Sequence, residues 1–180
     1  MPEKPEFSHP VPVASLEAGD AVCDEADEAA LVALARRFDV PAVRALSFVA
    51  KAEPWGPGGW RVSGVVDAAF TQSCVVTLEP VDTALSEPFE RFFAPPARMA
   101  EAEALFHPDA EEAPEPLAEA IDFGEIAAET AALALDPYPR KAGVDFEGAL
   151  TAPPGVAPMT DEDARPFAGL AALRGRDGST

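Results

Sequence analysis

The stretch from Arg44 to Phe93 decides the fold, and at its centre lies Thr71-Gln-Ser-Cys-Val-Val-Thr-Leu-Glu-Pro-Val81. Before this centre, two runs of alternating apolar and polar residues flank the turn Gly56-Pro-Gly-Gly59. Such alternation around a Gly/Pro turn is typical of a β-hairpin, because successive side chains of a strand point to opposite faces. After the centre, the pattern from Val81 to Phe93 predicts a third strand, in which Pro88 indicates an edge position or a bulge. The stretch therefore predicts an antiparallel sheet.

The residues before this stretch predict one strand and one helix that cover the sheet. Phe7 to Leu16 alternates weakly and contains prolines, which suits an edge strand. Asp24-Glu-Ala-Asp27 supplies short acids that cap a helix over residues 25–38, with an apolar stripe along one side. Pro41 ends this helix. Residues 7–93 are thus expected to form the β-rich core of a single domain that spans residues 1–180.

The residues after the core are acidic and interrupted by prolines. Residues 94–120 predict an acidic flexible linker, in which Met99 to Phe106 forms either a short helix or a solvated chain. Asp122-Phe-Gly-Glu125 is a capping box and predicts a helix over residues 123–135. A Pro-rich turn then closes the segment 121–139.

The last segment, residues 140–180, is expected to be irregular, with a short helix near residues 166–174. The fold class is therefore α+β: an antiparallel sheet, or a partly closed barrel, packed by two main helices.

The charge of the chain is strongly negative and unevenly distributed. Thirteen Lys and Arg against 32 Asp and Glu give a formal net charge of −19. Residues 29–99 are balanced, with seven acids and seven bases, whereas residues 100–129 hold ten acids and no base. Direct nucleic-acid binding normally uses a basic face. The chain offers such a face only as a local patch, whose candidate residues are Arg36, Arg37, Arg44, Arg61 and Arg91.

Catalytic and metal motifs are weak in this sequence. With two His and two Cys, neither the number nor the spacing of side chains supports a catalytic triad or a structural zinc site. The sequence thus predicts no cofactor, no metal and no small-molecule substrate. The N-terminus lacks an apolar signal region and no long apolar run follows, so a cytoplasmic protein with reduced thiols and no membrane partner is expected.

Three blocks of the sequence resemble the YceD-like family, proteins associated with accumulation of large-subunit ribosomal RNA. In that family a hairpin leads into Cys-x-x-Cys-Leu-x-Pro, and the corresponding residues of this chain are Cys74, Thr77, Leu78, Glu79 and Pro80. The other blocks are Ile121–Leu135 and Arg165–Leu173. The last resembles a C-terminal signature through Pro166, Phe167 and Leu170.

The chain departs from the family at the second cysteine of the central block. Many members have a cysteine there and a further pair later, a quartet typical of a metal or redox site. Here Thr77 and Arg140-Lys141 take those places. One thiol cannot form a tetrahedral thiolate site. Cys74 is therefore expected to be a small buried residue, and Arg140 and Lys141 to supply positive charge nearby.

The resemblance implies a non-enzymatic factor in large ribosomal subunit biogenesis. We expect its acidic residues, with Glu111, Glu112 and Glu115 as candidates, to contact basic ribosomal proteins or assembly factors, and its arginines to make weak rRNA contacts. Two alternatives remain open. One is an acidic adaptor or nucleic-acid mimic that binds basic proteins without RNA, and the other is a small thiol enzyme that uses Cys74 as its nucleophile.

Overall fold

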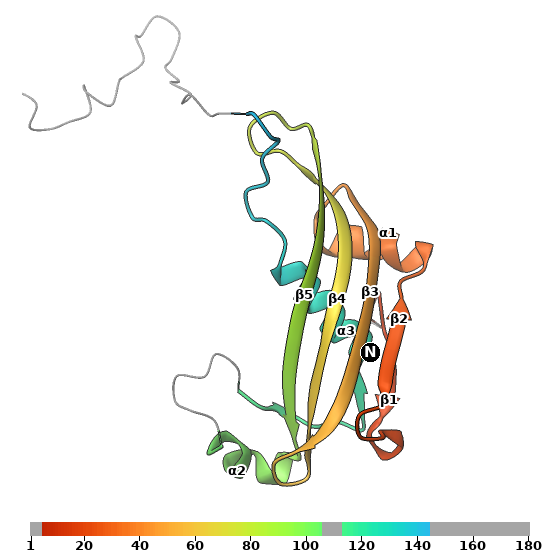
Figure 1. The fold of residues 1–180 in the computed structure, drawn as a ribbon, viewed down its shortest axis with the longest axis vertical. Coiled ribbons are helices and arrows are strands. Elements are labelled where there is room, and N and C mark those ends of the chain that lie inside the picture. Colours follow the sequence, from red (N-terminus) through yellow and green to blue (C-terminus); the bar gives the residue numbers. More distant parts are fainter. Residues whose placement is uncertain (1–4, 106–112, 145–180) are drawn as a thin grey trace, which may run out of the picture. The chain divides into compact units, whose positions relative to one another are not determined.

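Three long antiparallel strands dominate the computed structural model, which describes residues 5–105 and 113–144. They are β3 (Ala42–Trp55), β4 (Gly59–Ser73) and β5 (Pro80–Ala94). Two short strands extend the sheet: β2 (Ala21–Glu25) pairs with β3, and β6 (Glu115–Pro116) pairs in parallel with the end of β5. The sheet order is β2-β3-β4-β5-β6 (Figure 1).

The β3–β4 hairpin forms around the glycine turn that the sequence predicts. Trp55 pairs with Gly59, and both Gly56 and Gly58 adopt positive φ, a region in which residues other than glycine are strained. A Cβ at Gly59 would lie 2.1 Å from the carbonyl oxygen of Phe93. Glycine therefore lets the hairpin and β5 approach closely at this end of the sheet.

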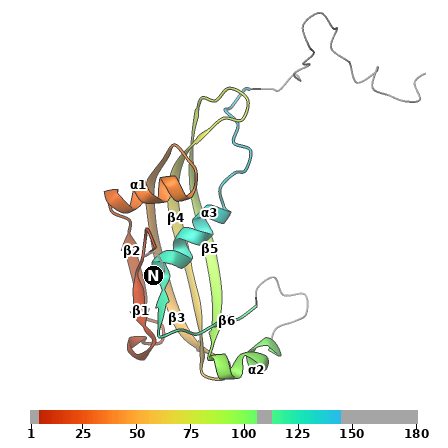
Figure 2. The same cartoon turned by 180° about the vertical axis from the view of Figure 1, so that it is seen from behind.

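One face of the sheet is covered, and the core lies beneath this cover. Helix α1 (Glu28–Arg37), helix α3 (Phe123–Leu133) and a two-stranded sheet of β1 (Pro10–Pro12) and β7 (Ala120–Asp122) lie on that face (Figure 2). The largest fully buried side chains are Phe70, Phe123, Leu34, Leu46, Val62, Val66 and Cys74. No helix of the described residues covers the opposite face, which is turned toward the viewer in Figure 1.

Helix α1 starts three residues later than the sequence predicts. Asp27 caps it, because its side chain accepts a hydrogen bond from the backbone N–H of Ala30 at 2.8 Å. The expected start at residue 25 is wrong because Ala21–Glu25 alternates and pairs with β3 as strand β2. Asp24 belongs to that strand, and its carboxylate binds the His9 ring at 2.7 Å.

Helix α3 begins where the capping box predicts. Asp122 accepts hydrogen bonds from the backbone N–H of Glu125 at 3.1 Å and from that of His9 at 2.7 Å. The same carboxylate accepts a third bond from the Ser8 hydroxyl at 2.6 Å. One side chain therefore caps α3 and ties the N-terminal residues to it.

The structure confirms some of the expectations for the strands and corrects others. The antiparallel sheet is confirmed apart from the parallel β5–β6 pair, but the partly closed barrel is wrong, because β2 and β6 lie at opposite edges of an open sheet. The strand expected over residues 7–16 shrinks to β1, followed by a 3-10 turn over Val13–Ser15. The edge position expected for Pro88 is confirmed, since β6 pairs only with Phe93 and Ala94 at the end of β5 and no described strand pairs with Pro88 on that side.

The segment expected as a linker forms regular structure in its described parts. Pro96–Arg98 is a 3-10 turn, and helix α2 spans Met99–Glu103 within the range the sequence allows for a short helix. Strand β6 and the start of β7 also fall inside residues 94–120. Residues 106–112 and the short helix expected near 166–174 lie outside the described residues.

The described chain up to Ala142 is one compact unit, and residues from Gly143 belong to a second. No helix in the described residues is long and apolar enough to cross a membrane.

Candidate functional site

The turn that joins β4 to β5 holds the central sequence stretch around Cys74. It is closed by two backbone hydrogen bonds: the N–H of Cys74 donates to the carbonyl of Glu79 at 2.8 Å, and that of Leu78 donates to the carbonyl of Cys74 at 2.9 Å. Leu78 has a φ of +60°, which costs energy for a residue with a Cβ. Its side chain is nevertheless 78% exposed, so burial of Leu78 in the core does not compensate this strain.

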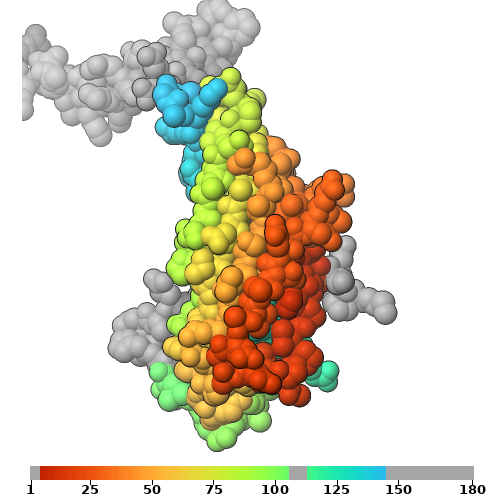
Figure 3. All heavy atoms as spheres, turned by 45° about the vertical axis from the view of Figure 1, so that its right-hand side comes forward, coloured from red at the N-terminus to blue at the C-terminus, as the bar shows by residue number. Residues whose placement is uncertain are grey.

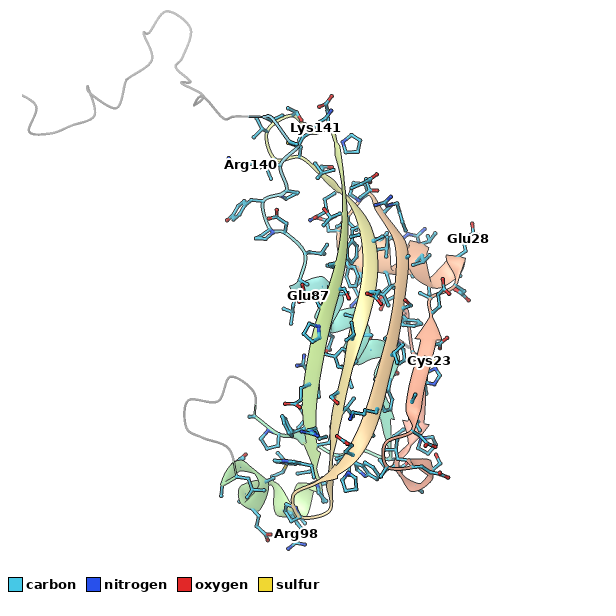
Figure 4. The ribbon with its side chains drawn as sticks, in the orientation of Figure 1. Cys23, Glu28, Glu87, Arg98, Arg140 and Lys141 are labelled. Carbon is cyan, nitrogen blue, oxygen red and sulfur yellow. The ribbon has the colours of Figure 1, made fainter. Side chains whose placement is uncertain are left out.

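A segment more than sixty residues later in the chain packs against this turn. The Gln72 side-chain amide donates to the carbonyl of Asp136 at 2.9 Å, and the N–H of Val75 donates to the carbonyl of Pro139 at 2.9 Å. The Lys141 ammonium binds the Glu79 carboxylate at 2.9 Å, which lowers the pKa of Glu79. Figure 4 shows Lys141 beside the β4–β5 turn. We call residues 72–79 and 136–141 together the thiol turn.

The sulfur of Cys74 lies at the centre of the thiol turn and accepts several hydrogen bonds. Its side chain is fully covered. The Thr77 hydroxyl donates to it, as do the backbone N–H groups of Lys141, Thr77 and Val76, and these donors lower the pKa of Cys74 from 9.0 to about 6. Hydrogen bonds that stabilise the charged form of a group have this effect. The hydrogen bonds therefore favour the thiolate form of Cys74.

This arrangement does not form a nucleophile with its base. Nucleophilic catalysis requires an adjacent general base that is oriented by a third group. Here the hydrogen-bond partners of the sulfur among the described residues are a hydroxyl and backbone N–H groups, all of which donate. The expectation that Cys74 is buried is confirmed. Sequence reasoning missed its lowered pKa, because the directions in which the Thr77 hydroxyl and the N–H of Lys141 point are set by the folded turn.

The donor set also does not fit a metal. One thiolate with a threonine, a lysine and backbone amides lacks the remaining thiolate or imidazole ligands of a tetrahedral site. Within residues 5–105 and 113–144, no three His, Cys, Asp or Glu side chains are grouped so that they could hold an ion.

The candidate basic residues are spread over the molecule, and most of them are in ion pairs. Arg37 on α1 binds Glu6 and, through two hydrogen bonds, Glu125 on α3. The other pairs are Arg44 with Asp82, Arg61 with Glu53 and Glu90, Arg91 with Glu115, and Lys141 with Glu79.

The remaining two candidates are exposed: Arg36 lies on α1, and Arg140 lies in the segment after α3. No ion pair of Arg36 or Arg140 occurs among the described residues. The structure thus brings Lys141 to Cys74, but it does not gather the arginines into one patch.

The candidate acidic residues are only partly described. Glu115 lies in β6 beside Arg91, and Glu111 and Glu112 lie outside the described residues. Pro166, Phe167 and Leu170 also lie outside them.

Comparison with known families supports the resemblance found in the sequence. The family model described as "Large ribosomal RNA subunit accumulation protein YceD" matches residues 62–174, well over half of the 180 residues. The chain belongs to the YceD family. The match covers β4 from Val62, the whole thiol turn, α3 and the C-terminal signature. Searches of curated proteins and of solved structures found no match.

Membership in the YceD family connects the chain to accumulation of large-subunit ribosomal RNA. The thiol turn lies inside the matched residues, so the family region includes both the turn and the segment that closes it.

Proposed function

We propose that this YceD family protein is a non-enzymatic factor that supports large-subunit rRNA accumulation through contacts with basic ribosomal or assembly proteins. The observation that carries the mode of contact is the charge pattern: residues 100–129 hold ten acids and no base. Acidic surfaces attract basic proteins by long-range electrostatics, which also speeds their encounter.

The pairing of the arginines favours protein contacts over direct RNA contacts. A phosphate group would have to displace a carboxylate from Arg37, Arg44 or Arg61 before it could bind there. Weak RNA contacts are therefore assigned to the exposed Arg36 and Arg140. The affinity of a protein for RNA grows with the number of phosphates that it neutralises. Binding through only two separated cations is therefore expected to be weak.

The proposal is tested by neutralising acids without disturbing the fold. Glu115 is left unchanged, because its carboxylate pairs with Arg91 next to β6. The test variant combines Asp109→Asn, Glu111→Gln and Glu112→Gln. A control variant, Glu17→Gln with Glu28→Gln and Asp39→Asn, removes the same charge at exposed positions outside residues 100–129.

The readouts are co-sedimentation with pre-ribosomal particles and the level of large-subunit rRNA in cells that carry each variant. We expect the test variant to lose association at moderate salt and the control variant to keep it. Unchanged association of the test variant would exclude the acidic contact. Unchanged rRNA levels in cells that lack the protein would exclude the function itself.

The adaptor alternative differs in its dependence on RNA. An acidic mimic would capture basic proteins with no RNA present. A pull-down from nuclease-treated extract therefore separates the two, since a ribosome-assembly factor loses the particles that RNA holds together, whereas a mimic keeps its partner.

The thiol-enzyme alternative has one observation in its favour, the lowered pKa of Cys74. Low-pKa thiols that act as nucleophiles are also accessible to their substrates. The covered side chain of Cys74 predicts slow alkylation of the native protein at neutral pH. Fast alkylation at Cys74, measured by peptide mass spectrometry with Cys23 as the exposed reference, would restore the enzyme alternative.

A further inference from the structure

An apolar row crosses the uncovered face of the sheet. Strand pairing aligns Cys23 with Val49, Val49 with Val65, and Val65 with Pro88, so the row runs over four strands. Val49 is 59% exposed and Val65 is 40% exposed, which is high for apolar side chains in the middle of a sheet. Figure 4 labels Cys23 on β2, where the row begins; on β5 the row ends at Pro88.

The row forms the floor of a shallow groove, which we call the Val65 groove. Its volume is about 710 Å³, and its lining includes Gly19, Val49, Lys51, Val65, Pro88 and Glu90. Figure 3 shows atoms of β3 (orange) and β4 (yellow) at the molecular surface on this side. The thiol turn lies at one end of the sheet, beyond the residues that line the groove.

The cations around the Val65 groove are paired with carboxylates. Lys51 binds Glu53 at 3.3 Å, and Arg61 binds both Glu53 and Glu90, so these cations are already neutralised.

The next row of the face runs from Glu25 through Ser47 to Asp67. Neither of its carboxylates forms an ion pair with a described residue. Asp20, which lies between the groove residues Gly19 and Ala21, also has no ion pair within the described chain. The groove is therefore apolar along its floor and acidic along its rim.

We propose that the Val65 groove binds a segment of a basic protein in which an apolar stripe is flanked by Lys or Arg. The apolar stripe would cover Val49 and Val65, and the basic side chains would pair with Glu25 and Asp67. A segment of this kind buries apolar surface and satisfies the unpaired carboxylates at the same time. The identification of that protein as a ribosomal or assembly protein rests on the proposed function.

The same charges argue against two other occupants. RNA would place phosphates beside Asp20, Glu25 and Asp67, where like charges repel. A second copy of this chain packed face to face would oppose the same carboxylates to one another. A basic protein segment is the occupant that the rim favours.

The first experiment uses a designed helical peptide of about 18 residues, with leucines on one face and lysines on the others. Its affinity for the full chain is measured by fluorescence anisotropy, with a peptide of the same composition in scrambled order as the reference. Val65→Lys is expected to weaken binding at least about tenfold, because it places a charge on the apolar floor. Asp67→Asn is expected to weaken binding a few-fold and to reduce its salt dependence.

Each groove variant has a matched control on the covered side of the molecule. Val32 on α1 is 51% exposed, so Val32→Lys adds the same charge to an exposed valine away from the groove. Asp39→Asn likewise removes a carboxylate next to α1. Equal loss of affinity in the groove variants and in the controls would overturn the proposal, because it would show charge attraction without a site.

A second readout does not depend on substitutions. Cys23 is exposed and lies in the apolar row, whereas Cys74 is buried. Bound peptide is expected to slow alkylation of Cys23 at least about fivefold at saturation, and an unchanged rate would contradict the proposal.

If Val65→Lys fails to fold, as judged by circular dichroism, Val65→Thr keeps the β-branched shape and tests the same contact.

The last arm separates this inference from the proposed function. Cells that carry Val65→Lys as their sole copy are compared with cells that lack the protein. Reduced rRNA in both supports the groove as the working surface, whereas normal rRNA with Val65→Lys overturns the groove and leaves the function intact. If light scattering detects a dimer that Val65→Lys abolishes, the groove is an interface between two copies of the chain and the proposal is overturned. If an RNA oligonucleotide displaces the peptide, the groove binds RNA and the proposal of a basic protein segment is overturned.

Discussion

At the scale of single residues, the Cys74 sulfur acts as a hydrogen-bond acceptor that organises a turn. The donors come from two places in the chain, the turn itself and Lys141. Because a thiolate accepts hydrogen bonds more strongly than a thiol, the thiol turn is expected to be tightest when Cys74 is deprotonated.

The first prediction is that Cys74 makes stability depend on pH. Its pKa is about 6 in the folded protein and near the ordinary 9.0 when unfolded, so the unfolded chain binds more protons between these values. The free energy of unfolding should therefore rise from pH 6 to pH 9 by more in the wild type than in Cys74→Ser. Urea unfolding at several pH values measures this, with Cys23→Ser as the exposed control. Parallel pH profiles of the wild type and Cys74→Ser would contradict it.

The second prediction concerns two neighbouring arginines. Arg37 binds Glu125 through two hydrogen bonds of 2.8 and 2.7 Å and also binds Glu6, and the Glu125 carboxylate raises the pKa of Arg37. Arg37→Ala should lower the free energy of unfolding by about 1 kcal/mol, the upper range for a half-exposed pair with bidentate geometry. Arg36→Ala, one residue away, should have little effect in the same denaturation experiment. Equal effects would mean that the ion pairs do not stabilise the fold.

At the scale of elements, Asp122 connects α3 to the N-terminal strand. Asp122→Ala removes the cap of α3 and also leaves the His9 N–H without its acceptor. We expect a loss of about 2 to 3 kcal/mol in the free energy of unfolding.

Asp27→Ala, which removes the cap of α1 alone, serves as the comparison for this third prediction. It should cost about 1 kcal/mol. Thermal denaturation of both variants compares them, and a loss for Asp122→Ala no larger than that for Asp27→Ala would show that the His9 contact contributes nothing.

The elements also show which local signals were sufficient. The hairpin, the capping box of α3 and the edge position of Pro88 could be predicted, because each depends on residues that are close in the sequence. The start of α1 could not, since Asp24 and Asp27 are equally good caps and only pairing with β3 makes Ala21–Glu25 a strand. Strand β6 is two residues long and exists because the end of β5 offers it a partner.

At the scale of the whole molecule, the fourth prediction follows from a net charge of −19. Like charges repel more strongly in the compact state, and salt screens them with a Debye length of about 10 Å at 0.1 M. Raising sodium chloride from about 10 to about 150 mM should therefore raise the Tm, and the rise should be smaller in the variant that neutralises Asp109, Glu111 and Glu112. A fall in Tm would mean that screening of ion pairs such as Arg61–Glu53 outweighs relief of repulsion.

The sequence by itself determined the α+β class, the antiparallel hairpin, the cap of α3 and the family, because these depend on local patterns and on motif order. Only the tertiary structure decided that the sheet stays open and that most candidate cations are neutralised by carboxylates. The same holds for Thr71–Val81: the sequence places Cys74 at a turn, but its lowered pKa depends on the folded geometry, which directs the Thr77 hydroxyl, the N–H of Lys141 and the N–H groups of Thr77 and Val76 to the sulfur. Ion pairs, thiol hydrogen bonds and exposed faces depend on which distant residues meet, and that is set by packing rather than by local order.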